Sequence, residues 1–361
     1  MEKLRVKLGD RSYDILISTN WLSQLGKTVK GIIPREKILI VTDDRVGNLY
    51  GDEALESLRA EDLNAEIMVL PHGEDNKNLA TVERIYNFLV EYNYARGSTL
   101  VALGGGVVGD ITGFAAATYM RGINYIQVPT SLMAMVDSSV GGKTGVNHPL
   151  GKNLIGSFYQ PKLVFTDTVL LETLAPEEFR SGMAEVIKYG IIRDADFFEL
   201  IEDKMESLIK GDVELLGKVI RRCCEIKAEV VSADERESGL RAILNFGHTV
   251  GHAIEALTNY RKYRHGEAVA IGMLAAARIA VQMKMFSEME TQRLWKVITR
   301  GNLPYQISNL DPEDIMERMK KDKKARMEYV RFALPSRIGE TEILDDVPGE
   351  IVLEVLKTMT D

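Results

Sequence analysis

The first half of the chain alternates short apolar, β-branched runs with segments that have helical spacing. Seven runs predict strands, at residues 4–8, 13–17, 37–42, 65–70, 99–103, 124–128 and 162–166. Residues 46–58 and 81–92 carry apolar positions three and four apart, which predicts helices. Because such alternation is typical of a parallel sheet covered by helices, we expect an N-terminal α/β domain whose first two strands form an edge hairpin.

The pattern becomes helical from about residue 175. Six segments predict helices, at residues 176–191, 195–209, 213–232, 246–257, 267–285 and 312–321, whereas only residues 329–334 look strand-like. Pro176 suits a first helical turn, where Glu177 and Glu178 favour the positive end of the helix dipole. We therefore expect an α/β domain over residues 1–174 and a mainly α-helical domain over residues 175–361.

Composition narrows the class of protein. A length of 361 residues suits two domains, and a net charge of −8 argues against a broad nucleic-acid or anionic-membrane surface. Cys223 and Cys224 are neighbours without a further partner, so no disulfide framework is expected. The first residues lack the apolar core of a signal peptide, and no uncharged apolar run reaches about 18 residues. We expect a cytoplasmic protein with neither nucleic-acid nor membrane partners.

A glycine-rich turn follows the strand predicted at residues 99–103. Gly104, Gly106 and Gly109 form the pattern G-x-G-x-x-G, which predicts a Rossmann-like turn whose backbone amides bind a pyrophosphate. The next strand does not end on the usual ribose-binding acid, and the best acidic candidates are Asp43 and Glu74. The alternative is a close-packed strand–helix corner that binds nothing.

Residues 129–153 form a long polar segment with glycines at positions 141, 142, 145 and 151. We expect these glycines to break regular structure, so that Lys143, Lys152 and Asn153 project from an irregular backbone suited to an anion. A Walker A loop is excluded because the position of its first glycine, six residues before Lys143, is not a glycine. The alternative is an ordinary polar surface loop.

Three of the five histidines lie within 18 residues of one another. His248 and His252 are four apart on a predicted helix and therefore share a face, and His265 follows. Thr249 occupies the position of the glutamate that a metallopeptidase helix requires, which disfavours a peptidase. Together with Glu185, the histidines could form a catalytic zinc site with an open position. The alternatives are packed or exposed histidines, and a simple ion pair between Glu185 and Lys188.

Five long runs together resemble the 3-dehydroquinate synthase family, within the superfamily of sugar phosphate cyclases and iron-type polyol dehydrogenases. They are residues 104–110, 129–153, 182–190, 244–255 and 265–273, and the resemblance covers nearly the whole chain in the same order. It implies the metal ligands Glu185, His248 and His265 around zinc or cobalt. It places His252 in the active site outside the metal shell, which spacing alone leaves open.

The resemblance also implies two further sets of contacts. NAD would contact Asp43, Gly73, Glu74, Lys77, Gly105, Gly106, Val107, Val108, Gly109, Asp110, Thr130, Ser131, Lys143, Lys152, Leu170, Leu171, Glu172 and Thr173. The substrate would contact Arg121, Asp137, Lys143, Lys152, Asn153, Lys188, Lys227, Arg241, Asn245 and His252. Lys323 or Lys324 would reach the same site, although the family's following glycine is missing. Ser131 replaces a common threonine and keeps its hydroxyl.

The implied reaction converts 3-deoxy-arabino-heptulosonate 7-phosphate to 3-dehydroquinate and phosphate, a step of the shikimate pathway to aromatic amino acids. NAD would oxidise the substrate transiently, phosphate would be eliminated, and re-reduction and an aldol closure would follow, in an enzyme that is commonly a homodimer. The alternatives are another sugar phosphate cyclase, a metal-dependent NAD polyol dehydrogenase that releases NADH, and a non-catalytic nucleotide- or metal-binding regulator.

Overall fold

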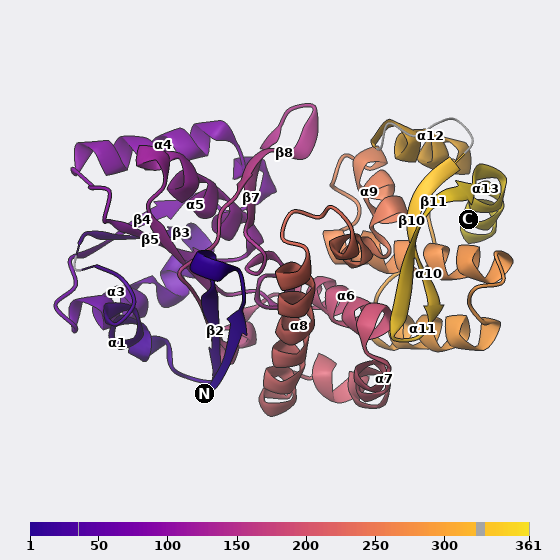
Figure 1. Cartoon of the computed structure of the whole chain (residues 1–361), viewed down its shortest axis with the longest axis horizontal. Coiled ribbons are helices and arrows are strands. Elements are labelled where there is room, and N and C mark those ends of the chain that lie inside the picture. Colours follow the sequence, from indigo (N-terminus) through magenta and orange to yellow (C-terminus); the bar gives the residue numbers. More distant parts are fainter. Residues whose placement is uncertain (35, 323–328, 361) are drawn as a thin grey trace. The chain divides into compact units, whose positions relative to one another are not determined.

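The computed structural model describes residues 1–34, 36–322 and 329–360 (Figure 1). They divide into two compact units, one of Met1–Leu174 with Leu216–Arg236 and one of Ala175–Leu215 with Glu237–Asp361. The chain first passes between the units after residue 174. Residues 216–236, which the sequence analysis assigned to the helical domain, group with the first unit because that part of a long helix packs there.

The first unit is built on a seven-stranded sheet in the order β1-β2-β9-β6-β5-β3-β4. Its strands are β1 Glu2–Val6, β2 Tyr13–Ser18, β3 Ile38–Asp43, β4 Ala65–Leu70, β5 Thr99–Gly104, β6 Asn124–Pro129 and β9 Leu163–Asp167. Strands β1 and β2 are antiparallel, and the other neighbours are parallel. The predicted α/β class, with an edge hairpin on a parallel sheet, is confirmed.

Helices supply the rest of the first unit's core. They are α1 Leu25–Lys30, α2 Asp44–Val46, α3 Asp52–Arg59, α4 Leu79–Glu91, α5 Gly106–Thr118 and most of α8 Val213–Ala233, with a π-helical segment Gly47–Gly51 between α2 and α3. One buried cluster joins Leu39 of β3, Leu89 of α4 and Ile111 of α5. Strands β3 and β5 are almost continuously apolar, as expected for strands that helices and neighbouring strands bury on all sides.

Residues 143–158 form a β-hairpin, so the expectation of an irregular backbone there was wrong. Strand β7 (Lys143–His148) pairs antiparallel with β8 (Gly151–Phe158), and Gly145 lies opposite Gly156. A Cβ atom on either glycine would collide with a backbone carbonyl oxygen of the opposite strand. These glycines therefore permit close strand pairing rather than interrupting it.

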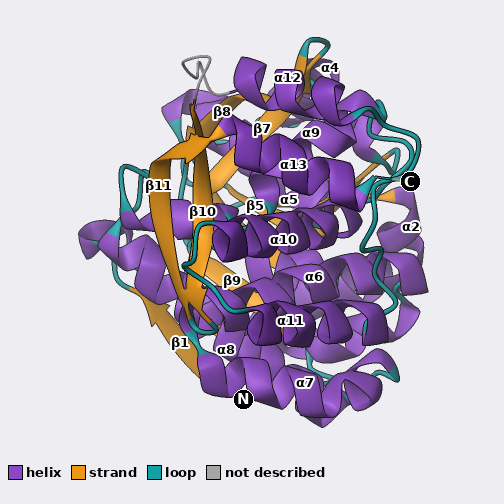
Figure 2. Cartoon of the chain, turned by 90° about the vertical axis from the view of Figure 1, so that its right-hand side faces the viewer, coloured by secondary structure: helices purple, strands orange, loops and turns teal. Residues whose placement is uncertain are grey.

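The second unit is mainly helical. It contains α6 Pro176–Arg193, α7 Ala195–Ile209, α9 His248–Leu257, α10 His265–Gln282, α11 Glu288–Arg300, α12 Pro312–Asp322 and α13 Gly349–Met359, with a hairpin of β10 Tyr329–Arg337 and β11 Glu340–Pro348. Figure 2 shows α6, α10, α11 and α13 alongside one another. Helix α11, whose buried residues form only a narrow stripe, was not predicted from the sequence, and neither were β11 and α13.

Helices α6 and α10 are the most deeply buried part of this unit. From Ser181 to Ile192, every residue of α6 is buried, and so are most residues of α10. A helix that is apolar nearly all round belongs inside a protein core. Among the described residues, no helix combines the length and apolar character needed to cross a membrane.

Asp167, the last residue of β9, joins the sheet to the segment after β2. Its Oδ1 accepts hydrogen bonds from the backbone N–H groups of Asn20 (2.8 Å) and Val169 (3.2 Å). Its Oδ2 accepts from the N–H groups of Trp21 (2.7 Å) and Leu22 (2.9 Å). Because the side chain is buried, these donors have little access to water as a substitute acceptor.

We predict that Asp167→Ala lowers the free energy of unfolding by about 3–5 kcal/mol, because buried N–H groups lose their acceptor. Urea denaturation followed by tryptophan fluorescence measures this change. The exposed Asp10→Ala variant is the control, with an expected change of about 0.5 kcal/mol or less. Equal stability of the two variants would contradict the role of Asp167.

Candidate active site

The predicted cofactor residues of the first unit follow the carboxyl ends of five parallel strands. Asp43 ends β3, residues 73–77 follow β4, residues 105–110 follow β5, Thr130 and Ser131 follow β6, and residues 170–173 follow β9. These strands are neighbours in the order β9-β6-β5-β3-β4. Because parallel strands end at the same edge, the fold brings these residues to one edge of the sheet, where ligands bind in such folds. The two remaining predicted NAD contacts, Lys143 and Lys152, lie on the β7–β8 hairpin.

The glycine turn between β5 and α5 combines close packing with backbone N–H groups at the start of a helix. A Cβ atom on Gly104 would lie 2.7 Å from the Cβ of Val108, and one on Gly109 would lie 2.8 Å from Oε1 of Gln127, so both glycines permit close packing. Gly105 is the N-cap of α5, whose first N–H groups have no partner within the helix. The first turn of α5 contains no acidic side chain, which leaves its positive end suited to an anion.

A buried lysine connects three segments at this edge. The Nζ of Lys77 donates hydrogen bonds to Oδ2 of Asp110 (2.6 Å) and Oδ1 of Asn153 (2.6 Å). Burial lowers the pKa of Lys77, but the charges of Asp110 and Glu74 outweigh burial and raise this pKa above its ordinary value. The lysine is therefore protonated and ties the segment after β4 to α5 and β8.

Asn147 of β7 belongs to the same network, and the sequence analysis did not single it out. Its Nδ2 donates to Oε1 of Glu74 (2.8 Å), and its Oδ1 accepts from the N–H of Asn153 (2.9 Å). Its own N–H donates to the carbonyl of Lys77 (2.8 Å). Lys152 lies nearby, with its Nζ 4.0 Å from the same Glu74 oxygen. The sequence feature that could have indicated Asn147 is its polar amide within residues 129–153, the segment that contains Lys143 and Lys152.

Among the predicted substrate contacts of the first unit, Asp137 and Lys227 lie together, whereas Arg121 lies elsewhere. Lys227 of α8 donates from Nζ to the carbonyl oxygen (2.6 Å) and to Oδ1 (2.7 Å) of Asp137. Arg121 follows the far end of α5 and precedes β6, at the amino ends of the strands. The first unit therefore does not bring Arg121 to the edge that holds the glycine turn.

In the second unit, glycines let three helices cross at backbone contact. A Cβ atom on Gly266 of α10 would collide with the carbonyl oxygen of Ser181 in α6. One on Gly272 would collide with the carbonyl oxygen of Gly247, whose φ of 82° also favours glycine just before α9. These crossings bring His248 and His252 of α9 to the first residue of α10, His265.

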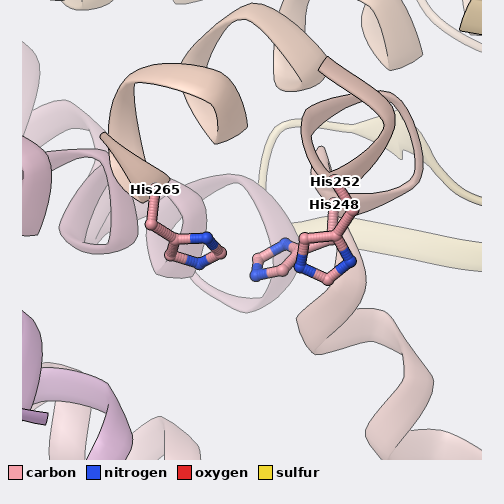
Figure 3. Close-up of side chains that lie close together, drawn as sticks. All are labelled: His248, His252 and His265. Carbon is pink, nitrogen blue, oxygen red and sulfur yellow. The ribbon is translucent and has the colours of Figure 1, made fainter. Parts of the chain in front are cut away.

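The three imidazoles are turned toward one another (Figure 3), and their candidate ligand nitrogens all lie within 4.8 Å of each other. Glu185 of α6 is fully buried beside them. Its Oε1 lies 3.6 Å from Nε2 of His248 and 3.6 Å from Nε2 of His265. Its other oxygen, Oε2, forms an ion pair with Lys188 one turn along the helix.

Hydrogen bonds orient two of the imidazoles. The Nδ1 of His248 lies 3.1 Å from the carbonyl oxygen of Phe246, and the Nδ1 of His265 lies 3.1 Å from Oε2 of Glu255. A carbonyl oxygen and a carboxylate accept hydrogen bonds, so each Nδ1 carries the proton and donates, and each Nε2 keeps a lone pair. Burial, followed by the charge of Lys188, lowers the pKa of His248 well below its ordinary value, which keeps this ring neutral.

Two further predicted residues of the second unit, Arg241 and Asn245, lie before α9. Arg241 and Asn245 belong to the 3₁₀ segment Leu240–Asn245, where Arg241 is buried and the Nδ2 of Asn245 donates to Oε1 of Glu237 (2.5 Å). Lys323 and Lys324 lie outside the described residues.

Comparison with known proteins identifies the family. The family model for the N-terminal part of 3-dehydroquinate synthase matches residues 67–181. The family model for its C-terminal part matches residues 182–325. The 3-dehydroquinate synthase of Picosynechococcus sp. is 51% identical over 355 residues, which cover 98% of this chain and 97% of that protein.

Two solved structures have the same architecture. A 2-deoxy-scyllo-inosose synthase complexed with carbaglucose-6-phosphate, NAD+ and Co2+ has a TM-score of 0.89 at 29% identity, over 99% of this chain and 100% of its own. The 2-epi-5-epi-valiolone synthase of Streptomyces hygroscopicus, with NAD+ and Zn2+ bound, has a TM-score of 0.90 at 28% identity, over 98% of each chain. With the family models and a relative at half identity spanning almost the whole length, the chain belongs to the 3-dehydroquinate synthase family.

Proposed function

We propose that this chain converts 3-deoxy-arabino-heptulosonate 7-phosphate to 3-dehydroquinate and phosphate. The observation that carries the proposal is the 51% sequence identity to a 3-dehydroquinate synthase over nearly the full length of the chain. The fold is shared with cyclases whose structures contain NAD+ and a divalent metal. The reaction comprises transient oxidation of a hydroxyl, elimination of phosphate, re-reduction and aldol closure. We also propose a cytoplasmic homodimer, as the sequence analysis expects.

The donor set around Glu185 fits a divalent metal such as zinc or cobalt. Its buried Oε1 accepts no hydrogen bond among the described residues, and the Nε2 atoms of His248 and His265 are equally distant from it. Two imidazoles and a carboxylate leave a fourth position open, which is typical of catalytic zinc. When bound, the metal supplies a Lewis acid for a substrate hydroxyl, and NAD supplies a reversible hydride acceptor.

The residues at the carboxyl edge of the first unit fit NAD. The amides at the start of α5 would bind the pyrophosphate, and Gly105 and Gly106 let the backbone approach it. Asp43 already accepts hydrogen bonds from the N–H groups of Arg45 and Val46, which holds its carboxylate at the end of β3. This carboxylate would bind a ribose hydroxyl.

Cationic side chains would hold the anionic substrate. Lys188 and Lys227 are buried and are each held by a carboxylate, Glu185 and Asp137 respectively. Orienting an ammonium group before a ligand arrives lowers the entropic cost of binding phosphate or carboxylate. The departing phosphate can itself take the proton that the elimination releases, so the residues need to bind, orient and exclude water rather than act as a dedicated base.

The first experiment incubates purified protein with NAD, Zn2+ or Co2+ and 3-deoxy-arabino-heptulosonate 7-phosphate. Equal amounts of phosphate and 3-dehydroquinate, no net NADH and inhibition by a chelator are expected. Phosphate released only from other hexose or heptose phosphates would assign another cyclase activity. NADH accumulating with a simple polyol would assign a dehydrogenase.

A second prediction concerns the metal. His265→Ala should lose the bound ion and lower turnover by more than about 100-fold, because it removes a proposed ligand outright. Metal content by mass spectrometry and phosphate release measure the two effects. His72→Ala, which removes an exposed histidine outside the cluster, should keep its metal. Full metal content in His265→Ala would exclude His265 as a ligand.

A third prediction separates substrate from cofactor binding. Lys152→Ala should raise the KM for the phosphorylated substrate by about 10-fold or more, because a charge-assisted contact is lost. The Kd for NAD, measured by calorimetry, should change much less. Lys162→Ala is the control, since this exposed lysine precedes the amino end of β9. Equal losses for substrate and NAD would show that Lys152 serves mainly the cofactor.

A further inference from the structure

Glu255 is a buried carboxylate beside the proposed metal site, and no proposed ligand set includes it. Its side chain is 4% exposed, and its Oε2 accepts a hydrogen bond from Nδ1 of His265 at 3.1 Å. Burying a carboxylate is costly unless a hydrogen bond or a charge compensates. Its burial against an imidazole therefore indicates a role that a solvent-exposed glutamate could not perform.

The position of Glu255 on α9 explains how it reaches His265. His248, His252 and Glu255 are spaced four and three residues apart, so all three lie on one face of this helix. That face points toward the start of α10, as the ring of His265 close to those of His248 and His252 shows (Figure 3). One helical face thus presents a proposed ligand, a second histidine and the carboxylate that contacts the other ligand.

The two proposed histidine ligands are oriented by different acceptors. Nδ1 of His248 donates to the carbonyl of Phe246, which no substitution removes, whereas Nδ1 of His265 donates to a side chain. A carboxylate at Nδ1 holds the ring with Nε2 unprotonated and makes that nitrogen a stronger donor to a metal. Nε2 of His265 is the atom that lies 3.6 Å from Oε1 of Glu185.

We propose that Glu255 is a positioning residue that orients His265 and strengthens its bond to the metal. The inference rests on the proposed metal site and adds a residue that acts on metal affinity through a ligand. Outer carboxylates of this kind typically change metal affinity by about 10- to 100-fold.

The test measures the metal affinity of metal-free protein directly, without turnover. Wild type, Glu255→Gln and Glu255→Ala are titrated with Co2+ in competition with a chromophoric chelator, and the visible spectrum of bound Co2+ is recorded. We expect Glu255→Ala to bind about 10- to 100-fold more weakly and with an altered spectrum. Glu255→Gln should be intermediate, because its amide oxygen still accepts the hydrogen bond but carries no charge.

Glu178→Gln is the matched control. The exposed Glu178 accepts a hydrogen bond from Arg264 (2.8 Å), the residue before His265, so this variant alters a nearby pair without touching the ring. Its Co2+ affinity and spectrum should match those of wild type. Melting temperatures of the metal-free proteins show whether each Glu255 variant is folded, and Glu255→Gln keeps the volume of the side chain.

If both Glu255 variants keep the Co2+ affinity and spectrum of wild type, the proposal is overturned. A lower melting temperature with unchanged Co2+ affinity would also overturn it, because a purely structural role would produce that result. A wrong assignment of the metal site would give a different result from a wrong role for Glu255. In that case wild type would bind no stoichiometric Co2+, or His265→Ala would bind as tightly as wild type.

Discussion

The buried carboxylate of Glu185 is the constraint around which the second unit is arranged. A carboxylate removed from water is stable only where cations, donors or a metal compensate it. Lys188 meets one of its oxygens, and His248 and His265 face the other. This arrangement requires three helices to cross at backbone distance, which the glycines of α10 permit. The close crossing of these helices therefore places the side chains of the proposed metal site.

Both units contain buried ion pairs between a lysine and a carboxylate. Each buries lysines next to carboxylates, with Lys77 beside Asp110 in the first unit and Lys188 beside Glu185 in the second. Under the proposed function, such pairs orient the amines before an anion binds, which lowers the cost of ordering them later. An enzyme that handles a phosphorylated sugar acid needs this property more than it needs a nucleophile.

Sequence reasoning found the elements of the site but not all of its connections. The glycine turn and the histidine pair have characteristic spacings, and the family resemblance named their partners. Asn147 and Glu255 escaped because a single amide or glutamate has no distinctive spacing; only their contacts with Glu74 and His265 reveal them. The hairpin of β7 and β8 was mistaken for an irregular loop because glycine permits both close pairing and chain breaks.

The sequence by itself determined the α/β character of the first half, the helical character of the second half and the family, because periodicity and long motifs are local properties. Tertiary structure alone decided the strand order β1-β2-β9-β6-β5-β3-β4 and the grouping of residues 216–236 with the first unit. It also decided which imidazole nitrogens face Glu185. These features depend on contacts between residues far apart in the chain, and apolar spacing within one element carries no information about them.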